Sequence, residues 1–301
     1  MNAPAHLPSA SVVLPAEDLT GAFAGTPARV RPRRRYPVRF LLALGFLAVL
    51  VLVALAPGLF TAYDPLAGDF SATLQAPGWA HPFGTDRLGR DVLARTLHGT
   101  RYSLLIGLGG MAVSATAGAF LGILAGQRSR LLDEATSRIF DVLSSFPGVL
   151  LAMLVVTFLG QGMANIALAV GIAGIPKFGR VVRAQTQLVR GADYVTQAAI
   201  YGLGRGRIFL HHVLPNVLVA VPVIATLYIG NTILIVSGLS FLGLGPQPPT
   251  PEWGVMLAES RDVLRVAWWP GVFPGAAITL TVIAFTITGA VLQKKFEGRI
   301  A

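Results

Sequence analysis

The strongest constraint on this chain is a series of apolar runs, each long enough to cross a lipid bilayer as a helix. A transmembrane helix needs about 20 consecutive, mainly apolar residues. Such runs cover residues 38–60, 103–126, 139–160, 217–244 and 273–292. Runs of this length and number predict an all-α membrane protein with several transmembrane helices.

The composition agrees with a chain that lies mostly in membrane lipid. Of its 301 residues, 53% are hydrophobic and only 13% are charged, whereas soluble domains carry about 25% charged residues. The absence of cysteine excludes disulfide bonds and thiolate metal sites. The net charge of +10 is concentrated just before the first apolar run, which indicates a membrane anchor and no nucleic-acid partner. Six arginines form this flank: Arg29, Arg31, Arg33, Arg34, Arg35 and Arg39.

A sixth span follows from topology, since one apolar run is short. Residues 164–175 fall short of a full span, and Pro176 and Lys177 come directly after them. Basic residues favour the cytoplasmic side of a membrane protein, which places both chain ends and the loop 177–212 on that side. This arrangement requires an even number of spans. We therefore count 164–182 as a helix and predict six transmembrane helices.

The remaining segments are assigned by their place relative to the membrane. Residues 1–37 are expected to form a disordered, basic cytoplasmic tail, and residues 293–301 a second cytoplasmic tail. The alternative for the first helix, 38–60, is a cleaved signal peptide, but the apolar run is too long and no clean cleavage site follows it. Residues 61–102 are expected to form a long extracytoplasmic connection.

The most informative connection is the polar, basic stretch 193–216, which reads DYVTQAAIYGLGRGRIFLHHVLPN. Asp193 is placed as the N-cap or the first-turn acid of a short helix. Glycines from Gly202 onward then interrupt the helix, and Pro215 stands where a new helix starts. The sequence of helix, glycine corner and helix predicts a shaped docking surface. The alternative is an ordinary cytoplasmic loop between two membrane helices.

The spacing from Gly202 to Pro215 resembles the coupling loop, or EAA loop, of ABC importer permeases. In that family the loop docks a short helix into a groove of a cytoplasmic ATPase. The family's Glu falls on Thr196 and its first Ala on Gln197, while Ala198 matches the second Ala. The resemblance implies an ATPase-coupling site made of Asp193, Thr196, Gln197, Ala198, Gly202, Leu203, Gly204, Pro215 and Asn216.

Two outer segments carry a second resemblance. Residues 81–104 read HPFGTDRLGRDVLARTLHGTRYSL, and their charges predict a short polar helix at the surface whose opposite charges pair locally. Residues 239–257 read LSFLGLGPQPPTPEWGVML, in which the prolines predict a stiff outer loop. Both segments closely resemble the C-type subunits of dipeptide and oligopeptide importers, in the peptide/nickel branch of ABC permeases. The residues of the first motif are Gly84, Asp86, Gly89, Arg90 and Asp91.

Several features of the predicted spans bear on packing and charge. The second span is rich in small residues, so we expect one of its faces to pack closely on another helix. In the third span, Asp141 is either an intramembrane functional acid or the partner of Arg138 in an ion pair. Pro147 is expected to kink the same span. Three tryptophans fit an interfacial aromatic belt: Trp253, Trp268 and Trp269.

The resemblance implies a type I ABC importer permease (MetI-like) with six transmembrane helices, five of which form the permease core at 103–292. It implies alternating access in the bacterial cytoplasmic (inner) membrane, with both termini cytoplasmic. The expected partners are a second homologous permease, two ABC ATPase subunits and an extracytoplasmic solute-binding protein. Di- or oligopeptides are the expected cargo. Nickel, glutathione or another small solute, and an ion-coupled secondary transporter, remain alternatives.

The sequence shows no chemistry of its own that hydrolyses ATP. No G-x-x-x-x-G-K-[ST] phosphate loop occurs, and no Gly-Lys pair is present. No Ser/His/Asp or paired-carboxylate arrangement is evident, and the adjacent His211 and His212 would point in different directions on a helix. We therefore expect a transport subunit and not an enzyme, with no catalytic residue, metal site or cofactor.

Overall fold

A computed structural model describes residues 37–127 and 129–296, and every regular element among them is helical. The predictions for residues 1–36 and 297–301 lie outside this described part. In chain order the elements are α1 (Val38–Leu55), η2 (Pro57–Leu59), η3 (Phe70–Ala72), α2 (Val92–Ala125), α3 (Arg130–Ser144), α4 (Gly148–Leu159), α5 (Met163–Arg190), α6 (Asp193–Ile200), α7 (Arg205–Ile208), η4 (Phe209–Val213), α8 (Leu214–Leu218), α9 (Ala220–Phe241), α10 (Trp253–Ser260), η5 (Arg261–Val263) and α11 (Trp269–Phe296).

Five helices are each long and apolar enough to cross a membrane: α1, α2, α5, the helical run Arg205–Phe241 and α11. Helices α3 and α4 meet the same criteria only as a pair, bent by 90° where they meet, and are the candidate for a sixth crossing. The bend lies at Pro147, between the end of α3 and the start of α4. Proline has no N–H and disfavours the helical conformation of the residue before it. The expected kink is therefore confirmed, and the predicted third span is two helices instead of one.

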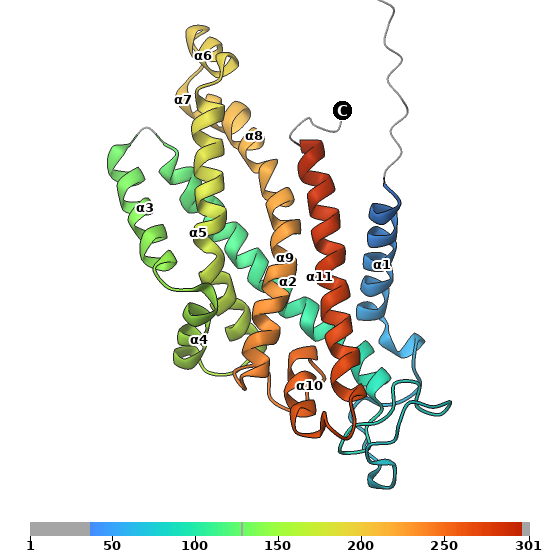
Figure 1. Cartoon of the computed structure of the whole chain (residues 1–301). Coiled ribbons are helices and arrows are strands. Elements are labelled where there is room, and N and C mark those ends of the chain that lie inside the picture. The colour runs from blue at the N-terminus through green and yellow to red at the C-terminus, as the bar shows by residue number, and fades with distance from the viewer. Residues whose placement is uncertain (1–36, 128, 297–301) are drawn as a thin grey trace, which may run out of the picture. The chain divides into compact units, whose positions relative to one another are not determined.

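Helix α2 runs obliquely through the bundle and packs closely along α5 (Figure 1). A Cβ at Gly118 would lie 2.6 Å from the Cβ of Phe178, and a Cβ at Gly122 would lie 2.5 Å from the carbonyl oxygen of Gly179. Only glycine allows the two backbones to approach this closely. The prediction that the small residues of this span pack on another helix is confirmed.

The predicted span with the shortest apolar run, residues 164–182, is part of one of the longest helices in the structure. Helix α5 has 28 residues and continues through Pro176, which is buried in the bundle. Membrane helices tolerate an internal proline because neighbouring groups satisfy the backbone atoms that it frees. The amine of Lys177 lies 5.1 Å from the centre of the Tyr228 ring, which gives the charge an aromatic contact. Neither residue ends the helix.

The basic segments gather at one end of the described bundle. The start of α1, the helix α6 and the end of α11 all lie at the upper end in Figure 1. Lys294 and Lys295 are in the last turn of α11, and Arg205 and Arg207 are in α7 beside α6. The connection before α2 and the helix α10 lie at the opposite end.

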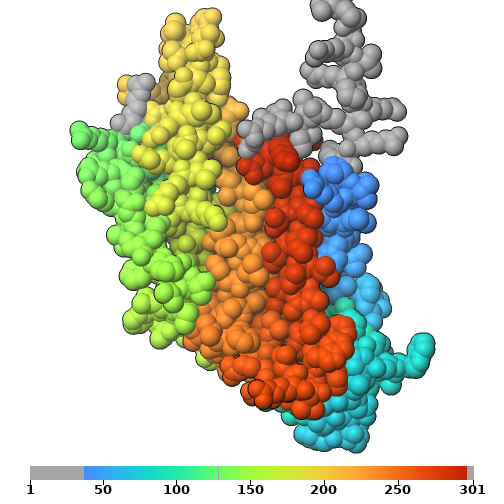
Figure 2. Space-filling model, in the orientation of Figure 1, coloured from blue at the N-terminus to red at the C-terminus, as the bar shows by residue number. Residues whose placement is uncertain are grey.

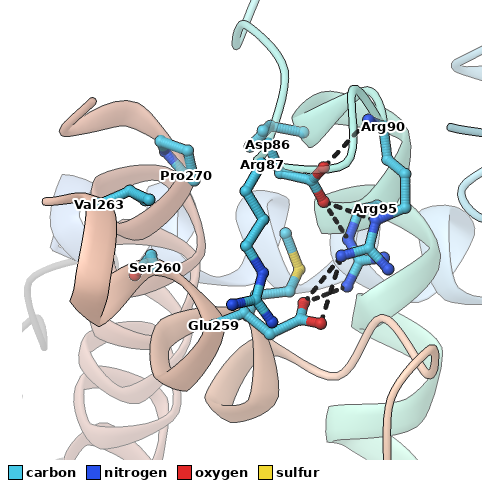
Figure 3. A pocket seen from close by; sticks show the side chains of 10 residues that line it. Asp86, Arg87, Arg90, Arg95, Glu259, Ser260, Val263 and Pro270 are labelled. Carbon is cyan, nitrogen blue, oxygen red and sulfur yellow. Dashed lines mark hydrogen bonds and ion pairs between the residues drawn. The ribbon is translucent and has the colours of Figure 1, made fainter. Parts of the chain in front are cut away.

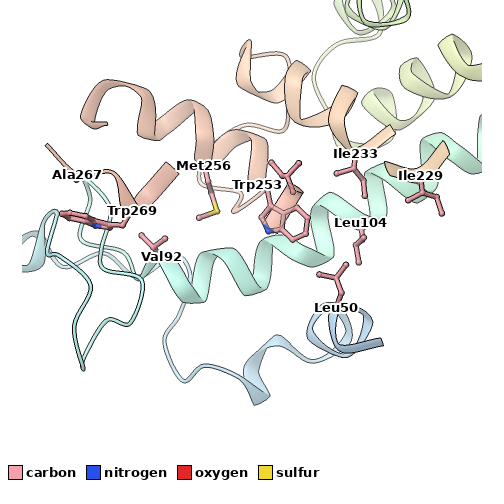
Figure 4. Close-up of a cluster of buried hydrophobic side chains, with 10 residues drawn as sticks. Leu50, Val92, Leu104, Ile229, Ile233, Trp253, Met256, Ala267 and Trp269 are labelled. Carbon is pink, nitrogen blue, oxygen red and sulfur yellow. The ribbon is translucent and has the colours of Figure 1, made fainter. Parts of the chain in front are cut away.

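A buried apolar cluster at that opposite end joins α2, α9, α10 and α11 (Figure 4). Trp253 is fully buried, and its Nε1 donates a 2.9 Å hydrogen bond to the carbonyl oxygen of Thr96 in α2. Trp269 is 8% exposed, and its Nε1 donates to the carbonyl oxygen of Thr85 at 2.9 Å. The predicted interfacial aromatic belt is therefore wrong for these two residues, which pack inside the protein. Trp268 is half-exposed.

Ion pairs join α3 to α5. Arg183 of α5 donates from Nε and Nη2 to the two carboxylate oxygens of Asp133, at 2.5 and 2.9 Å. Arg180 donates from Nη2 to Asp141 at 3.1 Å. The predicted partner of Asp141, Arg138, lies instead 4.0 Å from Glu134. The ion-pair interpretation of Asp141 is confirmed, but its partner comes from another helix.

Candidate functional site

The predicted docking helix is α6, with Asp193 in its first turn. The helix ends in a Schellman motif, in which the N–H of Gly202 donates to the carbonyl of Ala199 and the N–H of Leu203 donates to that of Ala198. Gly202 has a φ of +81°, a left-handed conformation that L-residues other than Asn and Asp rarely adopt. The glycine corner therefore turns the chain sharply between α6 and α7.

Helix α6 buries Ala198 and leaves most of its other side chains exposed. Ala198 is buried in an apolar cluster with Ile208, Val213 and Val217, and Leu203 packs against the same cluster. Three large apolar side chains on α6 or directly after it are exposed, by 44 to 82%: Tyr194, Ile200 and Tyr201. Figure 2 shows α6 standing clear of the bundle at its end. Helix α6 is thus held by its contact with the apolar cluster and exposes several apolar side chains at the protein surface.

The chain returns to the bundle through a widened helix. The segment η4, which is a π-helix, comes directly before α8, and Pro215 lies in the first turn of α8. Because proline lacks an N–H and its ring crowds the carbonyl four residues earlier, an ordinary α-helical turn is disfavoured there. The side-chain nitrogen Nδ2 of Asn216 donates a 2.7 Å hydrogen bond to the carbonyl of His212. These contacts fix the direction in which the loop re-enters the bundle.

The predicted coupling residues fall into three groups in the structure. Those exposed on or beside α6 are Asp193, Thr196, Gln197, Gly202 and Gly204. Ala198 and Leu203 face the apolar cluster and hold the helix in place. Pro215 and Asn216 lie at the far end of the loop, at the start of α8. The first group can meet a partner directly, and the other two shape the loop.

The second predicted motif, residues 84–91, forms a charge cluster with α2 and α10 at the opposite end of the bundle (Figure 3). Arg90 donates from Nε to Asp86 at 2.7 Å and from Nη2 to Glu259 at 3.2 Å. Arg95 donates from Nη2 to Glu259 at 2.8 Å. Arg90 is 3% exposed and Arg95 is 1% exposed. The prediction of a polar helix at the surface is wrong, because Asp86, Arg90, Asp91 and Arg95 are buried and the arginines bind a segment distant in sequence. The predicted local pairing of opposite charges is confirmed for Arg90 with Asp86.

The remaining motif residues shape the turn before α2. Gly84 and Gly89 both have a φ of +70°, which glycine adopts without strain. Asp91 caps α2, since its side chain accepts a 2.6 Å hydrogen bond from the N–H of Ala94. Its other carboxylate oxygen lies 2.8 Å from Nδ1 of His81. The motif is therefore a folded structural unit.

Glu252 joins the proline-rich loop before α10 to α2. It is fully buried and caps α10, accepting from the N–H of Val255 at 3.0 Å and from Oγ of Ser103 at 2.9 Å. Burial raises the pKa of this carboxyl above its usual range. The network fixes the start of α10 against the start of the second span.

Sequence reasoning missed Arg95, Glu252 and Glu259 as members of these networks. Each lies within or beside a recognised motif, yet no local pattern in the sequence brings Glu259 to Arg90 or Arg95. The contact from Arg90 to Glu259 joins residues 169 positions apart. Among the described residues, no group of three or more His, Cys, Asp or Glu side chains could hold a metal ion.

Comparisons with known proteins agree with this architecture. Residues 118–301 match the family described as binding-protein-dependent transport system inner membrane component. The di/tripeptide transport system permease protein DppC of Pseudomonas aeruginosa is 36% identical over 99% of this chain and 97% of its own length. The dipeptide transport system permease protein DppC of Alkalihalophilus pseudofirmus is 39% identical over 83% of this chain and 82% of its own length.

A third relative is the glutathione transport system permease protein GsiD of Salmonella typhimurium, 40% identical over 91% of this chain and 93% of its own length. Among solved structures, the crystal structure of an amino acid ABC transporter with histidines aligns with a TM-score of 0.52 at 13% identity. That alignment covers 68% of this chain and 94% of the other, and it supports the fold of an ABC transporter permease. The chain belongs to the family of binding-protein-dependent transport system inner membrane components, and is a multi-pass permease of the inner membrane and not an enzyme.

Proposed function

We propose that this chain is the membrane-spanning permease subunit of an ATP-driven importer that carries short peptides. The observation that carries the proposal is the match, over 99% of the chain, to a di/tripeptide permease. A second relative is named for dipeptides and a third for glutathione, which is itself a tripeptide. The shared chemistry of these cargoes is a short chain of amide-linked amino acids.

In the proposed orientation, the end that carries α6 faces the cytoplasm. Basic residues concentrate on the cytoplasmic side of membrane proteins, and Arg205, Arg207, Lys294 and Lys295 all lie at the α6 end. The buried charge cluster and α10 then face the extracytoplasmic side, where a solute-binding protein would deliver the cargo. Both termini would be cytoplasmic.

The exposed side of α6 is the proposed contact for one of two partner ATPases. Tyr194, Ile200 and Tyr201 offer exposed apolar area, and aromatic anchors contribute strongly to protein interfaces. Because Ala198 and Leu203 pack on the cluster that includes α7 and η4, a force on α6 would pass to the membrane helices. A second, related permease would complete the pathway, and ATP binding would drive alternating access.

Two alternatives differ from this proposal in cargo or energy source. A nickel or other small-solute importer would keep the same partners and change only the binding protein and the pathway lining. An ion-coupled carrier would need no ATPase, and membership of a binding-protein-dependent family favours the importer.

The test is an uptake assay on membranes that contain this chain, its permease partner, the ATPases and the binding protein. We expect uptake of a labelled dipeptide that requires ATP and the binding protein. ATP-dependent uptake of another solute without peptide uptake would change the cargo. Uptake driven by an ion gradient without the ATPases would overturn the proposal.

Replacing Gly202 with Asp should uncouple transport while the protein still inserts and folds. A Cβ at Gly202 would meet no atom within 4 Å, and Asp tolerates its left-handed conformation better than most residues. The new charge would lie at the tip of the docking surface. We expect dipeptide uptake to fall at least about tenfold, which corresponds to about 1.4 kcal/mol of lost interaction.

Gly202→Asn is the matched control, because Asn accepts the same backbone conformation and adds no charge. Uptake near the wild-type rate in Gly202→Asn, with low uptake in Gly202→Asp, is the expected pair of results. Normal uptake by a well-folded Gly202→Asp protein would remove the coupling role from this corner.

A further inference from the structure

A cavity of about 390 Å³ lies beside α6, bounded by the ends of α2 and α5 and by α7 and η4. Two arginines line it, Arg190 and Arg205, together with the polar side chains of Gln127 and Thr196. The other lining residues are apolar, and none of the lining residues is acidic. The cavity is therefore a positively charged space with one apolar wall.

The two arginines come from different segments. Arg190 is the last residue of α5, and its Nη1 donates a 2.8 Å hydrogen bond to the carbonyl oxygen of Gly126 at the end of α2. This bond holds the guanidinium at the cavity wall. Arg205 is the first residue of α7, on the other side of the glycine corner. Both guanidiniums therefore contribute positive charge to the same cavity.

The donor groups around the cavity suit an oxyanion. A guanidinium presents a fork of N–H donors that matches the oxygens of phosphate, and such charge-assisted bonds are stronger than neutral ones. Gln127 and Thr196 add an amide and a hydroxyl donor. We propose that this cavity binds a phosphate-type anion, with Arg190 and Arg205 as its charged ligands.

The size of the cavity favours an anion with a carbon group attached. Small-molecule sites occupy about 300–1,000 Å³, and their walls are mainly apolar. Ile208 and Phe209 form part of the apolar wall. Two sources share this chemistry: the headgroup of an anionic phospholipid, and a phosphate ion or phosphate ester from solution. Basic pockets at the cytoplasmic ends of membrane helices are known to suit anionic headgroups.

A bound anion would stiffen the coupling loop. The cavity walls belong to α5, α6 and α7, so an anion that bridges Arg190 and Arg205 would hold both arms of the loop against α5. This consequence rests on the proposed function, because a stiffer loop transmits the motion of an ATPase more completely. Binding itself can be measured without transport.

The experiment uses the purified complex of this chain with its permease and ATPase partners. Radiolabelled inorganic phosphate is titrated by equilibrium dialysis, and retained phosphatidylglycerol is counted by native mass spectrometry after reconstitution in mixed phosphatidylcholine and phosphatidylglycerol. The wild type should bind at least one of these probes. Arg205→Gln should weaken that binding about tenfold or more, because a charge-assisted contact is lost.

Thr196→Glu is the sharper variant. It places a tethered carboxylate in the cavity, where it would pair with the arginines and exclude the probe. Thr196→Gln adds nearly the same volume without the charge, so it should bind the probe more tightly than Thr196→Glu. Arg207→Gln is the control for Arg205→Gln, because Arg207 is exposed in the same short helix and does not line the cavity. Co-purification with the ATPases checks that each variant assembles.

Phosphate binding alone and phosphatidylglycerol binding alone both support the site and identify its source. No binding of either probe by the wild type overturns the proposal. Equal anion binding by the wild type and Thr196→Glu would also overturn it. An equal loss of anion binding in Arg205→Gln and Arg207→Gln would overturn it as well, because it would indicate an effect of general surface charge. Peptide uptake without anion binding would reject the anion site and leave the proposed function intact. Anion binding without peptide uptake would support the anion site and reject peptides as the cargo.

Discussion

Replacing Glu259 with Ala should lower the free energy of unfolding by about 3–5 kcal/mol. Glu259 receives hydrogen bonds from Arg90 and Arg95, which are 3% and 1% exposed. Without the Glu259 carboxylate, the Asp86 carboxylate is the acidic partner that remains for both arginines. Arg90 keeps its 2.7 Å contact to Asp86, whereas Nε of Arg95 lies 3.6 Å from Oδ2 of Asp86. Unfolding of the purified protein in mild detergent, followed by circular dichroism during titration with a denaturing detergent, measures the change.

Asp262→Ala is the matched control, since its side chain is 72% exposed three residues further along the same segment. We expect it to change stability by no more than about 0.5 kcal/mol. The double variant Glu259→Ala with Arg95→Met should recover part of the loss, because it removes the buried charge together with its partner. Equal stability of Glu259→Ala and Asp262→Ala would show that the charge cluster does not hold residues 84–91, α2 and α10 together.

Replacing Gly122 with Leu should prevent the normal packing of α2 on α5. Its Cβ would lie 2.5 Å from the carbonyl oxygen of Gly179 and 3.0 Å from the backbone nitrogen of Arg183, so a side-chain rotation cannot relieve the clash. We expect a destabilisation of about 3 kcal/mol or more and a large loss of folded protein in membranes. Size-exclusion chromatography after mild solubilisation measures the folded fraction.

Gly45→Leu provides the comparison for this substitution. Gly45 is exposed on α1, and a Cβ there would meet nothing within 4 Å. The same chemical change should therefore leave the folded fraction close to that of the wild type. A folded fraction for Gly122→Leu as high as that for Gly45→Leu would mean that the two helices can separate without cost.

The sequence predicted features that depend on nearby residues. Apolar length predicted the crossings, and the positive-inside rule correctly counted the weak run that became α5. The glycine corner was predicted because glycines interrupt a helix, and in the structure Gly202 has a backbone conformation that most residues avoid. The small-residue face of α2 was predicted because close helix packing in membranes requires such residues.

Features that depend on contacts between residues distant in the sequence could not be predicted from it. Asp141 was paired with Arg138 by helical spacing, yet Arg180 approaches it from α5 once α3 and α5 lie side by side. Trp253 and Trp269 looked like residues of a membrane interface, but both are buried and donate to backbone carbonyls of Thr96 and Thr85. The cavity beside α6 is formed by side chains from five segments, and no local pattern shows that they meet.

The sequence by itself determined the all-helical membrane architecture, the family and the shape of the exposed loop, because apolar length, spacing and glycine conformation act within a few residues. Only the tertiary structure decided which charges are buried and with whom they pair. The physical reason is that a buried arginine needs a carboxylate nearby in space, and the fold supplied Glu259 to Arg90 from 169 positions away.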